Sequence, residues 1–154
     1  MGSKHAMVLV VGVMCGLTVL ATPPADAQSA REACALVTQA QVTSAAGATV
    51  GAGQPIGTTG CQWSTDPKAK AGRVMITLSI WDEKRFPKGS TPGLTMKPVS
   101  GIGDDAVFYT LGDLTSLFVK KGKSTLQLRV YGLHDTTKQQ EIEKSVAKDA
   151  LARW

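Results

Sequence analysis

The stretch that decides the fold begins with CALVT (Cys34–Thr38) and ends with CQW (Cys61–Trp63). We interpret it as a short helical segment that a disulfide joins to the first strand of a sheet, with Trp63 packed behind the bond. An even pair of cysteines in an oxidising compartment is typical of a structural disulfide. Neither cysteine lies in a Cys-x-x-Cys motif, which disfavours a redox-active or metal-binding pair. A closed loop of this length is worth about 3 kcal/mol of stability.

The N-terminal segment predicts that the chain is exported. Residues 6–21 form an apolar run, and Thr22–Pro24 ends any helix there because proline lacks a backbone donor. The small residues of 25–27 suit a signal peptidase, so we expect cleavage before Gln28. The run is shorter than the ~20 residues needed to cross a bilayer, which argues against a transmembrane anchor. We therefore expect a signal peptide over residues 1–27 and a periplasmic or secreted protein that does not span the membrane.

Removal of this signal leaves a single domain with two cysteines. Cys15 is expected to be discarded with the signal, because Met14 before it is too bulky for a lipidation site. Residues 28–154 suffice for one ordinary domain and are too few for two. Cys34 and Cys61 remain as the pair to be joined.

The chain carries a moderate basic surplus. Its net charge is +5, and the signal removes one lysine and one aspartate, so the surplus is unchanged. Such a surplus favours anionic envelope polymers, phospholipid headgroups or an acidic partner protein. It is too dispersed to indicate nucleic acid. The densest basic group, Lys120, Lys121 and Lys123, falls at an expected hairpin turn, where a solvated turn is favoured over a binding patch.

The helical signals lie at the two ends of the domain. SARE (29–32) fits a capping box, and TQAQ (38–41) starts a second short helix that ends at Gly47. Asp135 or Thr136 is expected to cap a final helix. Its apolar face consists of Ile142, Val146, Ala150, Leu151 and Trp154.

The strand signals lie between these helices. Residues 73–81 are the clearest, because Val74, Ile76, Leu78 and Ile80 alternate with other side chains. The other expected strands are 61–63 and an antiparallel meander over 106–110, 115–120 and 124–131. Residues 48–60 predict a loop or a weak edge strand. The sequence therefore predicts an α+β two-layer domain: an antiparallel sheet of about five strands with an N-terminal helical segment, a C-terminal helix and one disulfide.

Residues 82–98 interrupt the sheet. Three prolines break this charged segment, so we expect an excursion with at most one helical turn over 82–86. A segment of this length without regular structure is either functional or disordered.

CALVT (34–38), CQW (61–63), VSGIGDDA (99–106) and the LFVKKG hairpin (117–122) together resemble a loose group of small exported bacterial proteins and lipoproteins of unassigned function. The resemblance spans nearly the whole mature chain. It implies an envelope location and a cysteine-stapled α+β fold. Members of the group are often lipid-anchored, whereas this chain has no convincing lipidation motif. The resemblance implies no catalytic residues.

No set of residues predicts catalysis, a metal site or a cofactor. His134 with Asp135 is the one neighbouring His–carboxylate pair of the mature chain, but no Gly-x-Ser-x-Gly motif presents a nucleophile to it. Asp104, Asp105 and Asp113 are too few for Ca²⁺ and are typical of turns and strand starts. One mature histidine and two oxidised cysteines cannot complete a zinc site.

The second face of the sheet is the candidate binding surface. If the aliphatic residues face the helices, the opposite face carries aromatic, methionine and arginine side chains, a composition enriched in binding patches. The candidates are Met75, Trp81, Phe118, Arg129 and Tyr131. The alternative is that the 82–98 excursion or the C-terminal helix covers this face as a second core layer.

Three hypotheses on function follow. The first is a non-enzymatic binding module of the cell envelope that uses this sheet face and the 82–98 segment, and whose partner is an envelope protein or an anionic envelope component. The second is a small secreted hydrolase that uses His134. The third is a purely structural envelope protein.

Overall fold

The computed structural model describes residues 32–68, 72–89 and 91–154. The expected signal peptide lies outside the described residues. None of the helices within these ranges is long and apolar enough to span a membrane.

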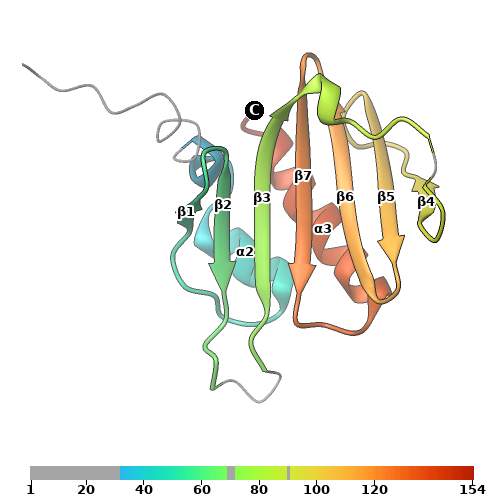
Figure 1. The fold of residues 1–154 in the computed structure, drawn as a ribbon. Coiled ribbons are helices and arrows are strands. Elements are labelled where there is room, and N and C mark those ends of the chain that lie inside the picture. The colour runs from blue at the N-terminus through green and yellow to red at the C-terminus, as the bar shows by residue number, and fades with distance from the viewer. Residues whose placement is uncertain (1–31, 69–71, 90) are drawn as a thin grey trace, which may run out of the picture.

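A single antiparallel sheet of seven strands forms the centre of the molecule, in the order β1-β2-β3-β7-β6-β5-β4 (Figure 1). The strands are β1 (Gln54–Ile56), β2 (Gly60–Ser64), β3 (Met75–Asp82), β4 (Thr95–Pro98), β5 (Asp105–Leu111), β6 (Leu114–Lys121) and β7 (Ser124–Tyr131). The helical elements are α2 (Gln39–Ala46), α3 (Thr136–Leu151) and the 3₁₀ turn η1 (Glu83–Arg85). Residues 32–35 are also helical. The predicted α+β class is confirmed, and so is the β5–β6–β7 meander.

The expectation of about five strands was wrong, because β1 and β4 complete the sheet at its two edges. Both are short, β1 with three residues and β4 with four, so neither is long enough to show a clear period of two. Each contains a proline, Pro55 in β1 and Pro98 in β4, which is tolerated on an edge strand. Their pairing is set by the neighbouring strands: Pro55 lies opposite Cys61 and Pro98 opposite Val107.

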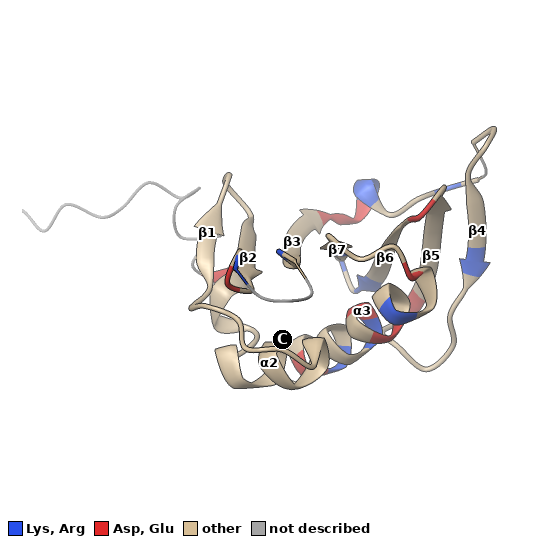
Figure 2. Ribbon diagram, turned by 90° about the horizontal axis from the view of Figure 1, so that it is seen from below, with Lys and Arg blue, Asp and Glu red and all other residues tan. Residues whose placement is uncertain are grey.

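The core lies between the sheet and the helices. Figure 2 shows α2 and α3 on one side of the curved sheet and the segment that follows β3 on the other. Ile76, Leu78 and the alternate residues of β6 and β7 are fully buried against this helical layer, as the period of two predicted. The helices contribute Val42, Ile142, Val146, Ala147 and Ala150 to the same core.

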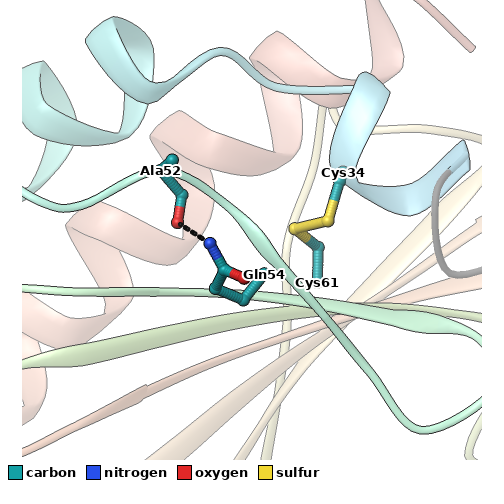
Figure 3. The surroundings of a disulfide bond; sticks show 4 residues. All are labelled: Cys34, Ala52, Gln54 and Cys61. Atoms are coloured by element: carbon teal, nitrogen blue, oxygen red, sulfur yellow. Dashed lines mark hydrogen bonds between the residues drawn. A yellow bond between two sulfur atoms is a disulfide. The ribbon is translucent and has the colours of Figure 1, made fainter.

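The predicted disulfide is present. Cys34 and Cys61 are bonded, with their Cα atoms 5.0 Å apart, and the bond joins the first helical turn to β2 (Figure 3). Trp63 is 1% exposed, two residues along the same strand face. Gly53 packs so closely that a Cβ there would lie 2.8 Å from both the Cys61 sulfur and Trp63 Nε1. The disulfide and Trp63 thus form one packed unit with the chain that precedes β1.

The caps predicted for α2 and α3 are present, whereas the capping box predicted at 29–32 lies mostly outside the described residues. Thr38 and Gln41 form the capping box of α2, and Gly47 ends this helix with a φ of 65°. Asp135 caps α3 by accepting hydrogen bonds from the backbone N–H groups of Thr137 and Lys138.

Candidate ligand site on the open sheet face

The strand register places all five candidate binding residues on the face that points away from the helices. Met75 lies opposite Tyr131, and Phe118 lies opposite Gln127, the residue two before Arg129. All five candidates are half-buried. They therefore belong to one face, but Trp81 stands at one end of β3 and Met75 at the other.

The C-terminal helix does not cover this face, because α3 packs against the opposite one (Figure 2). The 82–98 excursion covers only part of it and leaves a cavity of about 410 Å³ between itself and the sheet. The lining residues come from the sheet and from the excursion: Trp81, Gln127, Arg129, Phe118 and Tyr109, with Arg85, Pro87, Lys88, Gly89 and Thr91. The excursion therefore covers part of this face and also encloses a cavity against it.

Backbone and side-chain hydrogen bonds hold the excursion in place above the sheet. The Asp82 carboxylate accepts from the Lys84 N–H at 2.8 Å, which starts η1. The Glu83 N–H donates to the Lys123 carbonyl at 2.9 Å, which ties η1 to the β6–β7 turn. The Tyr109 hydroxyl donates to the Gly89 carbonyl at 2.9 Å. The roof of the cavity is therefore attached to the sheet at both ends of the segment 83–89.

The aromatic side chains of the floor are fixed by specific contacts. Trp81 Nε1 donates to Gln127 Oε1 at 3.2 Å, while the Arg85 guanidinium lies 5.0 Å from the centre of the Trp81 ring. Tyr109 and Phe118 pack edge to face, with ring centres 5.5 Å apart. The floor thus presents ordered aromatic surfaces.

Arg129 is oriented by its neighbours on the sheet. Its Nε donates to Ser116 Oγ at 3.0 Å, and its Nη1 lies 3.4 Å from the Tyr131 hydroxyl. A guanidinium has five N–H donors, so these two bonds leave donors for a further acceptor. Tyr131, a predicted binding residue that does not line the cavity, therefore acts here as a support for Arg129.

The cavity is electropositive. Arg85, Lys88 and Arg129 line it, and its lining includes no aspartate or glutamate. Within the described ranges the two ion pairs join Lys120 to Glu83 and His134 to Asp113, so neither neutralises these three cations.

Sequence reasoning found part of this site. Trp81, Phe118 and Arg129 line the cavity, whereas Met75 and Tyr131 do not. It missed Tyr109. Val107 lies opposite Phe118, and alternation along β5 places Tyr109 on the same face as Val107. The 82–98 segment was expected to contribute to binding or to cover this face, but Arg85 and Lys88 were not named, because no local pattern indicates which of its side chains face the sheet.

A smaller cavity of about 140 Å³ adjoins the first. It shares Tyr109, Phe118 and Arg129 with the larger cavity, and Leu94, Leu111, Leu114 and Ser116 complete its lining. Leu111 is 57% exposed and is the single large hydrophobic residue exposed in the described part of the chain. The second cavity is thus an apolar continuation of the first.

His134 is not placed for catalysis. Its Nδ1 lies 2.8 Å from a carboxylate oxygen of Asp113, and its side chain is 93% exposed. The hydrogen bond with His134 lowers the pKa of Asp113. Neither residue lines the two cavities described above. Asp135, the neighbour that the sequence suggested as partner, instead caps α3.

The acidic residues considered for Ca²⁺ serve the strand turns. Asp104 accepts from the Gly122 N–H at 2.7 Å, while its own N–H donates to the Lys120 carbonyl. Asp105 begins β5, and Asp113 follows its far end. In the described ranges, no group of three or more His, Cys, Asp or Glu side chains is arranged to hold a metal ion.

A buried polar network lies under the helical face of the sheet. Thr115 Oγ1 is 3.1 Å from both carboxylate oxygens of Glu143 and from Gln139 Oε1. Gln139 Nε2 donates to the carbonyl oxygens of Asp113 and Leu133. Burial raises the pKa of Glu143 to about 8, and the Thr115 hydrogen bond lowers it by a smaller amount.

No protein-family model, no curated protein and no solved structure matches this chain.

Proposed function

We propose that this protein is an exported, non-enzymatic binding module that holds a small organic ligand in the cavity between the open sheet face and the 82–98 excursion. The observation that carries the proposal is the cavity itself: about 410 Å³, lined by three aromatic side chains and three cations. Ligand sites of proteins span roughly 300–1,000 Å³ and combine apolar walls with a few fixed polar groups.

Three further observations support a binding role. The Cys34–Cys61 disulfide is typical of exported proteins. The basic surplus of +5 favours anionic ligands or partners. The exposed position of His134 removes the geometric support for a hydrolase, because a general base must meet a nucleophile at a substrate pocket.

The test is a screen of small organic compounds by amide chemical shifts in ¹⁵N-labelled protein. We expect the shifts of binding compounds to cluster on Trp81, Tyr109, Phe118 and Arg129. The double variant Trp81→Ala/Arg129→Gln should lose this binding and keep a melting temperature close to that of the wild type. Arg153→Gln, at an exposed arginine outside the site, is the control and should bind normally.

Two results would contradict the proposal. One is a screen covering acids, bases and neutral compounds in which no compound shifts the cavity residues. The other is a compound that binds and is turned over around His134.

A further inference from the structure

We propose that the ligand is an amphipathic organic anion, with its acidic group on Arg129 and its apolar body on Tyr109, Phe118 and the leucines of the second cavity. This inference rests on the proposed function and specifies the chemical class of the ligand.

The acidic head group is assigned by charge. A cavity lined by Arg85, Lys88 and Arg129 and by no carboxylate attracts anions and repels cations. Arg129 is oriented by two hydrogen bonds, one from its Nε to Ser116 and one from its Nη1 to Tyr131. A planar guanidinium fixed in this way suits a carboxylate, which it can bind through two parallel hydrogen bonds.

The position of Arg129 connects the head group to an apolar body. Arg129 lines both cavities, as do Tyr109 and Phe118. The larger cavity extends toward Trp81 at the end of β3, while the smaller one extends toward Leu111 and Leu114 at the β5–β6 turn. An acid held by Arg129 therefore has apolar surface on both sides of its attachment point.

The apolar part of the groove favours a hydrocarbon chain or ring over a purely polar anion. Leu94, Leu111 and Leu114 contribute aliphatic surface, and Leu111 is 57% exposed. Removing apolar area of this kind from water under a ligand makes the free energy of binding more favourable. Inorganic phosphate or acetate would satisfy the arginine but leave this surface in contact with water.

Compounds that share a chain and differ in the head group test the proposal. Binding of octanoate, octan-1-ol, octylammonium and acetate to the exported protein is measured by calorimetry and by amide shifts. We expect octanoate to bind at least tenfold more tightly than octanol, and octylammonium and acetate to bind weakest. From hexanoate to octanoate, affinity should rise by up to about fourfold for each buried methylene.

Matched variants separate the two parts of the ligand. Arg129→Gln should reduce octanoate affinity to the level of octanol, while Arg153→Gln should leave it unchanged. Leu111→Ser should reduce the gain in affinity from each added methylene and should leave the preference for the acid over the alcohol unchanged.

Several outcomes would overturn the inference. Equal binding of octanoate and octanol, or a preference for octylammonium, would refute the anionic class while the cavity remained a binding site. If the protein co-sedimented with phosphatidylglycerol vesicles but did not bind monomeric octanoate, its ligand would be a bilayer surface and not a free amphiphile. A chemical screen that never perturbs the cavity would instead defeat the proposed function itself.

Discussion

At the scale of single residues, burial raises the pKa of Glu143, and the hydrogen-bond pattern around the carboxyl group can accommodate the bound proton. Glu143 is 0% exposed, and the Thr115 hydroxyl faces three acceptor oxygens with only one proton to give. A protonated Glu143 resolves this conflict, because it donates to Thr115, which then donates to Gln139. The elevated pKa of Glu143, about 8, agrees with this pattern.

This protonation makes stability depend on pH. The pKa of Glu143 rises from an ordinary value of 4.5 to about 8 in the folded chain, so the folded state keeps a proton that the unfolded state loses. The contribution of this group is full below pH 4.5 and declines as pH rises from 4.5 to 8, on the order of 1.4 kcal/mol per pH unit. Urea denaturation at several pH values measures the decline.

The substitution Glu143→Gln should flatten this part of the pH profile, because a neutral amide does not titrate. Glu141→Gln, at an exposed position of the same helix, should leave the profile unchanged. A wild-type stability that stays constant or rises between pH 5 and pH 8, after subtraction of the Glu143→Gln curve, would show that Glu143 is ionised in the fold.

At the scale of elements, the link from β7 to α3 depends on a glycine in close contact. Gly132 has a φ of 84°, and a Cβ added there would collide with the Arg73 carbonyl oxygen just before β3. Gly122, in the β6–β7 turn, has a φ of 59° but open space around it. Alanine substitutions at the two positions therefore distinguish the cost of backbone strain alone from the cost of strain plus a steric collision.

We expect Gly122→Ala to destabilise the fold by about 1 kcal/mol, the strain of a left-handed alanine. Gly132→Ala should cost about 3 kcal/mol or more, because the collision adds to the same strain. Equilibrium unfolding of the two variants measures the difference. Equal losses would mean that the chain before β3 moves away at no cost.

Element by element, the sequence predicted the segments whose signals are local. The alternation over 73–81 found β3, and the capping residues found the starts of α2 and α3. β4 was missed because TMKP (95–98) is only four residues long and ends a segment that three prolines interrupt; its pairing comes from the edge of β5. Gln139 and Glu143 interrupt the apolar face of α3, and their burial depends on Thr115 in a distant strand.

At the scale of the whole molecule, the disulfide connects the opening helical turn to the sheet. The bonded cysteines are 27 residues apart, and loop entropy for that span corresponds to roughly 3–4 kcal/mol. The double variant Cys34→Ala/Cys61→Ala should lose about this much stability, as measured by the urea midpoint. Wild-type protein in reducing agent should unfold at a similar midpoint, whereas a wild-type midpoint unaffected by reductant would contradict the prediction.

The candidate site was predictable only in part, because some of it depends on contacts between segments that are far apart in the sequence. Period-two alternation assigns Trp81, Phe118 and Arg129 to one sheet face from local sequence alone. Their meeting with Arg85 and Lys88 requires the excursion to turn back over the sheet. That path is fixed by long-range contacts such as the Tyr109–Gly89 hydrogen bond, which no short stretch of sequence encodes.

The two outer strands also limit how this protein can meet another chain. β1 spans three residues and contains Pro55, while β4 spans four and ends at Pro98 after Lys97. Proline cannot donate to a ladder, and lysine on an outer strand discourages stacking of sheets side by side. Polymerisation through backbone pairing is thereby disfavoured. We therefore expect this protein to recognise partners through its side chains, which can change during evolution without altering the fold.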